Sequence, residues 1–210
     1  CRKIEKEENG LPMWAWKGDG FVLGFVAVDV ETASSRSQGY ICSIGVCVIR
    51  DGRIVEEFYT LCHPGIAMDP FCQNIHGITD EMVEGAPTTY EMLEKVAPYL
   101  EGQTVVAHNA PFDVKQIREA AERVGFSLPA FDHCCTVQLS RKVFPNRPSY
   151  RLGALVDLIG FPFTAHNALA DARACAALFL ACRAELERHP APRHPNRKRK
   201  NKHAANRENR

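Results

Sequence analysis

An apolar run that ends in two acidic residues is the feature that most constrains this chain. Residues 25–28 read Phe-Val-Ala-Val, and Asp29 and Glu31 follow with one valine between them. Side chains alternate along a strand, so both carboxylates face the same way. Two ionised carboxylates about 5 Å apart repel by roughly 3 kcal/mol at an effective dielectric near 20, and a divalent cation between them reverses that sign. The alternative is a strand that runs out into a solvated acidic loop.

Two further carboxylates stand at the starts of predicted helices. Asp113 falls in the first turn of a helix that follows the apolar strand 104–107, where the helix macrodipole favours an acid in any case. Asp171 opens an Ala-rich helix and has no basic residue three or four positions away. A carboxylate on an apolar helical face needs a distant partner or a metal ion. Asp171 therefore favours a metal site over a solvated loop.

The segment 74–80, Asn-Ile-His-Gly-Ile-Thr-Asp, adds a third pattern. Thr79 is expected to cap a short helix that begins near Asp80. Gly77 predicts a tight turn that holds Ile75 and His76 outward.

Taken in order, these motifs resemble the DEDDh family of 3′→5′ exonucleases, in particular the proofreading epsilon subunits of bacterial DNA polymerase III and their stand-alone relatives. The resemblance rests on Asp29-x-Glu31, on Asp113 after His-Asn-Ala-Pro-Phe, and on His166 five residues before Asp171. It covers about residues 21–185. Each motif alone is weak, whereas the ordered set is specific.

The resemblance implies an α/β, ribonuclease H-like fold with a five-stranded mixed β-sheet flanked by α-helices. The sequence pattern agrees, because three consecutive strands precede helix-separated ones. We predict strands at 22–30, 40–50, 53–62, 103–107 and 131–136, with Asp51-Gly52 as a hairpin turn. We predict helices at 88–100, 112–124, 137–144, 152–159 and 168–186.

The resemblance also assigns roles to the acidic residues. It implies two divalent metal ions, Mg²⁺ or Mn²⁺, which suit hard oxygen ligands. Asp29 would bridge the ions, Glu31 and Asp171 would complete the site of the attacking water, and Asp113 would hold the second ion. His166 would accept the water's proton. Substrate contacts are implied for Val30, Thr32, Ile75, His76, His108, Asn109 and Phe112, with His108 also expected to brace the loop that positions Asp113.

The expected function is hydrolysis of phosphodiester bonds at the 3′ end of DNA, at single-stranded or frayed ends, in proofreading or repair. The products would be nucleoside 5′-monophosphates, and a DNA polymerase subunit is a possible partner. An exoribonuclease would share every catalytic residue, so RNA stays open as the substrate. A non-catalytic nucleic-acid binding module is the other alternative.

Charge divides the chain into an acidic body and a basic end. Residues 189–210 contain eight Lys or Arg and one Glu, a net +7, and the preceding residues carry 18 basic against 24 acidic side chains, a net −6. We predict an N-terminal extension at 1–20, an exonuclease domain at 21–188 and a basic disordered tail at 189–210. The tail is either a solubilising end or an arm that attracts phosphates.

Nine cysteines lie mostly within apolar runs and form no Cys-x-x-Cys pair. We interpret them as small buried hydrophobes, with zinc binding or disulfides as the alternative. No apolar run approaches the roughly 18 to 20 residues that cross a bilayer, so no membrane partner is expected. A cytoplasmic location is predicted.

Overall fold

The computed structural model describes residues 24–36 and 38–189. The predicted N-terminal extension and residues 190–210 of the predicted basic tail lie outside these residues, as do the first two residues of the first predicted strand.

The described residues contain the expected five-stranded mixed sheet. Its strands are β1 (Gly24–Thr32), β2 (Ile41–Arg50), β3 (Arg53–Leu61), β4 (Thr104–Ala107) and β5 (Asp132–Cys135). The spatial order is β3-β2-β1-β4-β5. The first three strands pair antiparallel, whereas β4 runs parallel to both β1 and β5. Asp51 and Gly52 both have positive φ, as their two-residue hairpin turn requires.

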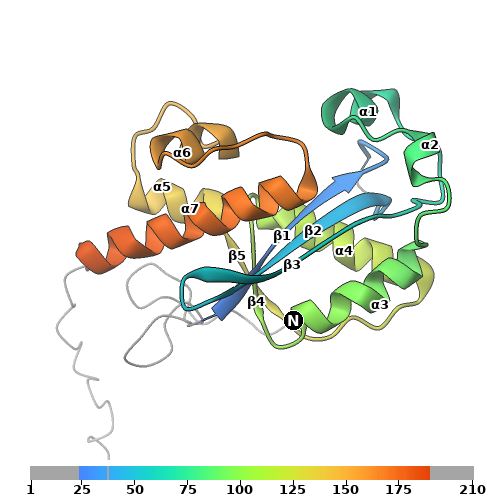
Figure 1. Ribbon diagram of the computed structural model, residues 1–210, viewed down its shortest axis with the longest axis horizontal. Coiled ribbons are helices and arrows are strands. Elements are labelled where there is room, and N and C mark those ends of the chain that lie inside the picture. The colour runs from blue at the N-terminus through green and yellow to red at the C-terminus, as the bar shows by residue number, and fades with distance from the viewer. Residues whose placement is uncertain (1–23, 37, 190–210) are drawn as a thin grey trace, which may run out of the picture.

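Helices cover both faces of this sheet. They are α1 (Pro70–His76), α2 (Asp80–Val83), α3 (Thr89–Leu100), α4 (Ala110–Val124), α5 (Thr136–Val143), α6 (Leu152–Leu158) and α7 (Ala168–Arg188). Figure 1 shows α3 and α4 on one side of the sheet and α5, α6 and α7 on the other, with α1 and α2 beyond the end of β1. Of the helices in the described ranges, none is long and apolar enough to span a membrane.

Strand alternation sorts β1 between two cores. Phe25 and Ala27 pack with α7, whereas the valines at 26, 28 and 30 pack against the layer formed by α3 and α4. Asp29 and Glu31 continue the first series, since side chains two residues apart share a face. The alternation therefore directs both carboxylates toward the face that α7 covers.

The structure corrects the sequence analysis in the segment before α2. Helix α1 was not predicted, although Asp69 caps it by accepting a 2.9 Å hydrogen bond from the Phe71 amide and Gly77 ends it with φ of 73°. Helix α2 begins at Asp80 with Thr79 at its N-cap position, as predicted, but the Thr79 side chain forms no capping hydrogen bond. At the same place the Asp80 side chain accepts the Met68 amide at 2.9 Å.

The cysteines in the described residues behave as small hydrophobes. All eight are free thiols and all are buried, which confirms the interpretation for these eight. They are Cys42, Cys47, Cys62, Cys72, Cys134, Cys135, Cys175 and Cys182.

A glycine on β2 sets how closely α7 can approach the sheet. Gly45 pairs with Asp29 across the β1–β2 ladder. A Cβ atom built on Gly45 would lie 2.3 Å from both the carbonyl carbon and the oxygen of Ala168, the first residue of α7. The absence of a side chain here therefore lets α7 bring Asp171 toward the end of β1.

We expect Gly45→Ala to lower the free energy of unfolding by about 1–3 kcal/mol, the usual range for overpacking a tight core site. The matched control is Gly153→Ala in α6, where the new Cβ meets the nearest Phe163 atom at an ordinary 3.7 Å. Alanine in a helix is favoured over glycine by roughly 0.5–1 kcal/mol, so the control should be neutral or stabilising. Urea denaturation of both variants makes the comparison. Equal stability of the two variants would contradict the close approach at Gly45.

Candidate active site

Two elements from opposite ends of the chain bring three carboxylates together. Asp29 and Glu31 stand on β1, and Asp171 stands in the first turn of α7. One carboxylate oxygen from each lies within 4.8 Å of the others. Three acids at such separations form a plausible ligand set for a hard cation.

Asp113 joins the same region from the first turn of α4 and is almost completely buried. Its Oδ1 accepts a 3.3 Å hydrogen bond from the amide of Val30, the residue between Asp29 and Glu31. This bond fixes the start of α4 to the end of β1. Asp113 lies outside the tight group of three, but the charges of Glu31 and Asp171 still raise its pKa.

Burial raises the pKa of every carboxyl group in this cluster, and repulsion from neighbouring acids adds to the rise for Asp29, Glu31 and Asp113. Desolvation is the main cause for Asp29, whose pKa rises further through the charges of Asp113, Asp171 and Glu31. Burial and then Asp171 raise the pKa of Glu31 to about 7. Burial also raises the pKa of Asp113 to about 8, against the lowering effect of backbone hydrogen bonds. Without a cation, the cluster therefore retains protons near neutral pH.

Asp171 is the carboxylate with the most local support. Burial raises its pKa, whereas hydrogen bonds from the backbone of Asn167 and His166 lower it. The Asn167 amide donates to its Oδ2 at 2.9 Å, and the Asn167 side chain caps α7 by accepting the Ala170 amide at 3.0 Å. Sequence analysis missed Asn167 as a positioning residue. Its signal was available, because asparagine just before a helix is a common N-cap.

The chemistry of this donor set fits divalent metal ions. All four side chains offer only oxygen, and within residues 24–36 and 38–189 no ion pair with a basic side chain neutralises any of them. Hard oxygen donors with excess negative charge are what Mg²⁺ and Mn²⁺ bind.

His166 lies at the exposed rim of the cluster, in the loop before α7. Its backbone has φ of 67°, in the left-handed region that non-glycine residues seldom adopt and that is enriched at functional sites. His166 acts on two neighbours through its charge: it opposes the rise that burial causes in the pKa of Asp171, and it adds to the fall that burial causes in the pKa of His76. The structure thus brings His166 close to the metal-binding candidates, as the sequence predicts.

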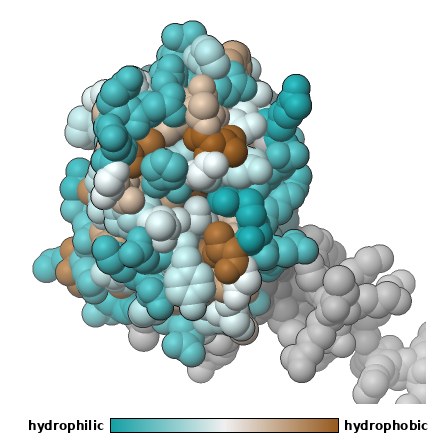
Figure 2. Space-filling view, turned by 90° about the vertical axis from the view of Figure 1, so that its right-hand side faces the viewer, coloured by the Kyte–Doolittle hydropathy of each residue, from teal (hydrophilic) through white to brown (hydrophobic). Residues whose placement is uncertain are grey.

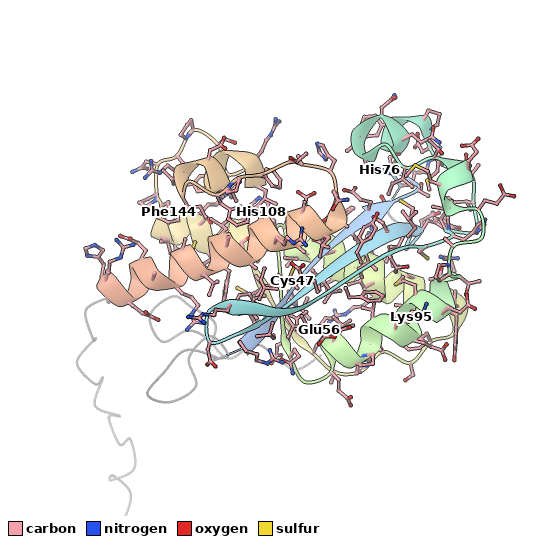
Figure 3. The ribbon with its side chains drawn as sticks, viewed as in Figure 1. Cys47, Glu56, His76, Lys95, His108 and Phe144 are labelled. Atoms are coloured by element: carbon pink, nitrogen blue, oxygen red, sulfur yellow. The ribbon has the colours of Figure 1, made fainter. Side chains whose placement is uncertain are left out.

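His76 has a different orientation from the one expected. Its Nδ1 accepts the Ile78 amide at 3.0 Å and its Nε2 donates to the Thr32 carbonyl at 3.2 Å (Figure 3). Burial lowers its pKa, which agrees with this neutral tautomer. The prediction that the turn holds both residues outward is right for Ile75, which is 41% exposed, and wrong for His76. The imidazole ties α1 to the end of β1.

His108 forms a second tie of the same kind. Its Nε2 donates to the Tyr150 carbonyl at 3.0 Å, so its Nδ1 can accept the Thr136 hydroxyl at 2.9 Å (Figure 3). Burial lowers its pKa, so the ring is neutral. These contacts agree with the expected bracing role. Its partners lie 28 and 42 residues away, and no local sequence pattern announces them.

The other predicted substrate residues differ in what they can offer. The side chain of Val30 lies in the core and its amide is bonded to Asp113. Its carbonyl is therefore the group that it could offer to a substrate. Thr32 uses its carbonyl to hold His76. Asn109 is the N-cap of α4 and has φ of 72°, and Phe112 in the first turn of that helix is 37% exposed.

Apolar side chains are also exposed beyond the end of β1. Figure 2, which views the face that carries α1 and α2, shows separate brown patches among hydrophilic residues. The large exposed apolar residues of these two helices are Phe71, Ile75 and Met82.

Comparison with known proteins agrees with this geometry. A family model described as "Exonuclease" matches residues 26–179. DNA polymerase III subunit epsilon of Aquifex aeolicus is 30% identical over 164 residues, covering 77% of this chain and 81% of that protein. The 3′-5′ exonuclease DinG of Bacillus subtilis is 33% identical over 171 residues, covering 80% of this chain and 18% of that protein.

A solved exonuclease structure is also similar to this chain. Exonuclease X in complex with 5′-overhanging duplex DNA superposes with a TM-score of 0.64 at 27% identity, covering 80% of this chain and 95% of that one. The chain spans 12% to 25% of the length of several curated relatives that it matches. The matched region holds all four carboxylates, and the predicted ribonuclease H-like fold is confirmed. The chain belongs to the 3′-5′ exonuclease family, with DEDDh exonucleases as its structural neighbours.

Proposed function

We propose that this chain is a metal-dependent 3′→5′ exonuclease that removes nucleoside 5′-monophosphates from single-stranded or frayed DNA ends. The observation that carries the proposal is the partly buried group Asp29, Glu31 and Asp171, whose oxygens lie within 4.8 Å of one another with no basic side chain paired to them in the described residues. A partly buried cluster of this kind lowers stability unless a cation or protons compensate its charge. Membership of the exonuclease family supports the assignment.

The proposed cofactors are two divalent ions, Mg²⁺ or Mn²⁺. Asp29 would contact both ions, Glu31 and Asp171 would complete one site, and Asp113 would serve the other. When bound, such ions lower the pKa of water and stabilise the charge that develops on a phosphate group. The family generally uses divalent metals, which agrees with the acidic site.

The remaining catalytic work falls to residues at the rim. His166 is exposed, lies near Asp171, and can take the proton from the attacking water. Ile75 and Phe112 offer exposed apolar surface to the terminal base. His76 would act chiefly by holding α1, and therefore Ile75, against the end of β1.

The proposals for substrate, partner and location each rest on a single observation. DNA is favoured because exonuclease X, the neighbour at 27% identity, is bound to DNA. Association with a polymerase is supported by the relative named as an epsilon subunit. Eight free thiols agree with a reducing, cytoplasmic location. We also retain the proposed boundaries, an extension at 1–20, an exonuclease domain at 21–188 and a basic tail at 189–210, with the tail as a phosphate-attracting arm.

In a chelator, the free energy of unfolding should fall as the pH rises from about 6.5 to 8. Burial raises the pKa of Glu31 to about 7 and that of Asp113 to about 8, whereas carboxyls in an unfolded chain titrate near 4. The folded protein then binds more protons than the unfolded chain, so rising pH favours unfolding. Urea denaturation at several pH values measures this slope.

Two controls sharpen that measurement. Glu31→Gln should give a shallower dependence of the unfolding free energy on pH. The variant lacks one carboxyl group that binds a proton in the folded protein but not in the unfolded chain. Added Mg²⁺ or Mn²⁺ should stabilise the wild type more at pH 8 than at pH 6.5, since the metal competes with protons for the same oxygens. A free energy of unfolding that rises with pH in the chelator, or that does not change when metal is added, would contradict the proposed acidic site.

Digestion of 5′-end-labelled single-stranded DNA and RNA tests the activity itself. With Mg²⁺ or Mn²⁺ the wild type should shorten DNA from the 3′ end and release nucleoside 5′-monophosphates. Asp29→Asn should keep less than a tenth of this activity but be at least as stable in a chelator, because one repelling charge is gone. An inactive wild type under both metals would favour the non-catalytic alternative, and a preference for RNA would favour the exoribonuclease.

A further inference from the structure

The basic side chains of the described part of the chain are unevenly distributed. From 24 to 189 the sequence holds 14 Lys or Arg and 20 Asp or Glu, yet no acid lies between Asp132 and Asp157. That interval carries four basic residues, all of them exposed: Arg141, Lys142, Arg147 and Arg151. Residues 141–151, the end of α5 and the loop to α6, are called the basic segment below. The remaining described body has ten basic residues against 20 acidic ones.

The basic segment is held in a defined shape by Tyr150. The Tyr150 hydroxyl donates to the Phe144 carbonyl at 2.8 Å and accepts the Arg147 amide at 3.3 Å. The guanidinium of Arg141 lies over the Tyr150 ring, 5.4 Å from its centroid. Prolines at 145 and 148 restrict the backbone further. Arginines on such a loop lose less conformational freedom when they bind a ligand.

The same tyrosine connects the basic segment to the candidate active site. Its carbonyl accepts the His108 Nε2 at 3.0 Å, and His108 lies directly before the α4 start that positions Asp113. Tyr150 and Leu152 also pack against the core beneath α7, the helix that carries Asp171. Figure 1 shows α5 and α6 on the face that α7 covers, with the chain running from α6 to the first turn of α7. The basic segment is thus in contact with the start of α4, which supplies Asp113, and with the core beneath α7, which supplies Asp171.

We propose that the basic segment binds the phosphodiester backbone of the substrate strand, a few nucleotides upstream of its 3′ end. This inference rests on the proposed exonuclease function. The negative charges of a nucleic-acid strand are repelled by the acidic body of the protein. Within the described residues, the positive charges of the basic segment offset this repulsion locally. Guanidinium groups match phosphate geometry, and neither Arg147 nor Arg151 forms an ion pair with a described residue.

The test is the double variant Arg147→Gln/Arg151→Gln in the full 210-residue chain. Fluorescence anisotropy with a labelled strand of about 20 nucleotides, in a chelator to prevent cleavage, gives the Kd as a function of salt. We expect a Kd about tenfold higher at low salt, and a log–log salt slope reduced by about 1.4, that is roughly 0.7 for each of two lost phosphate contacts. DNA and RNA strands should be affected alike, because they share the backbone.

The matched control removes the same charge elsewhere, on β3 and on a helix that covers the opposite face of the sheet. Arg53→Gln/Lys95→Gln changes the start of β3 and an exposed position on α3 (Figure 3). Its Kd should stay within twofold of the wild type. A Kd for Arg147→Gln/Arg151→Gln that matches this control, or a loss confined to one type of strand, would overturn the proposal.

Hydrolysis separates strand binding from chemistry. With metal, the double variant should show about tenfold higher KM for the long strand but unchanged kcat and KM for a p-nitrophenyl ester of thymidine 5′-monophosphate, which has no upstream phosphates. Tyr150→Phe, which keeps the ring and removes the hydroxyl, should shift KM the same way by less. Equal losses on both substrates would show damage to the active site and overturn the strand-binding role. If the wild type hydrolyses neither substrate, the proposed function fails, and the anisotropy still decides the binding surface.

Discussion

The burial of several carboxylates side by side is the constraint around which this structure is arranged, although Asp29 and Glu31 are only partly buried. Burial raises the pKa values of Asp29, Glu31, Asp113 and Asp171 above their ordinary range, and the charges of neighbouring acids raise the first three further. An isolated fold gains nothing from placing acids there, because apolar side chains at the end of β1 would extend the core at no electrostatic cost. The arrangement is explained if the carboxylates exchange their protons for metal ions, and locally unfavourable groups of this kind are characteristic of functional sites.

The frame around the cluster consists of contacts that do not neutralise it. The Val30 amide holds Asp113 and the Asn167 amide holds Asp171, so each acid is fixed by a neutral donor. Farther out, the neutral imidazoles of His76 and His108 connect α1 and the α5–α6 loop to the ends of β1 and β4. Gly45 lets α7 close on the sheet. Together these contacts position the acids while leaving their charge available to a cation.

How far the sequence predicts this structure depends on the range of each interaction. The alternation that puts Asp29 and Glu31 on one face of β1 is local and was predicted, as was the hairpin at Asp51-Gly52. Helix α1 was missed because seven residues carry too little periodicity, although Asp-Pro and Gly marked its ends. The inward turn of His76 depends on the Thr32 carbonyl, 44 residues away, and sequence spacing gives no sign of it.

The central claim is that these carboxylates exchange protons for metal. Titration calorimetry with Mn²⁺ near pH 7, repeated in buffers of different ionisation enthalpy, counts the protons released as the metal binds. The account predicts saturable binding with net proton release that diminishes toward about pH 9, where Glu31 and Asp113 are already ionised. Saturable binding without proton release, or no binding in the wild-type protein, would contradict it.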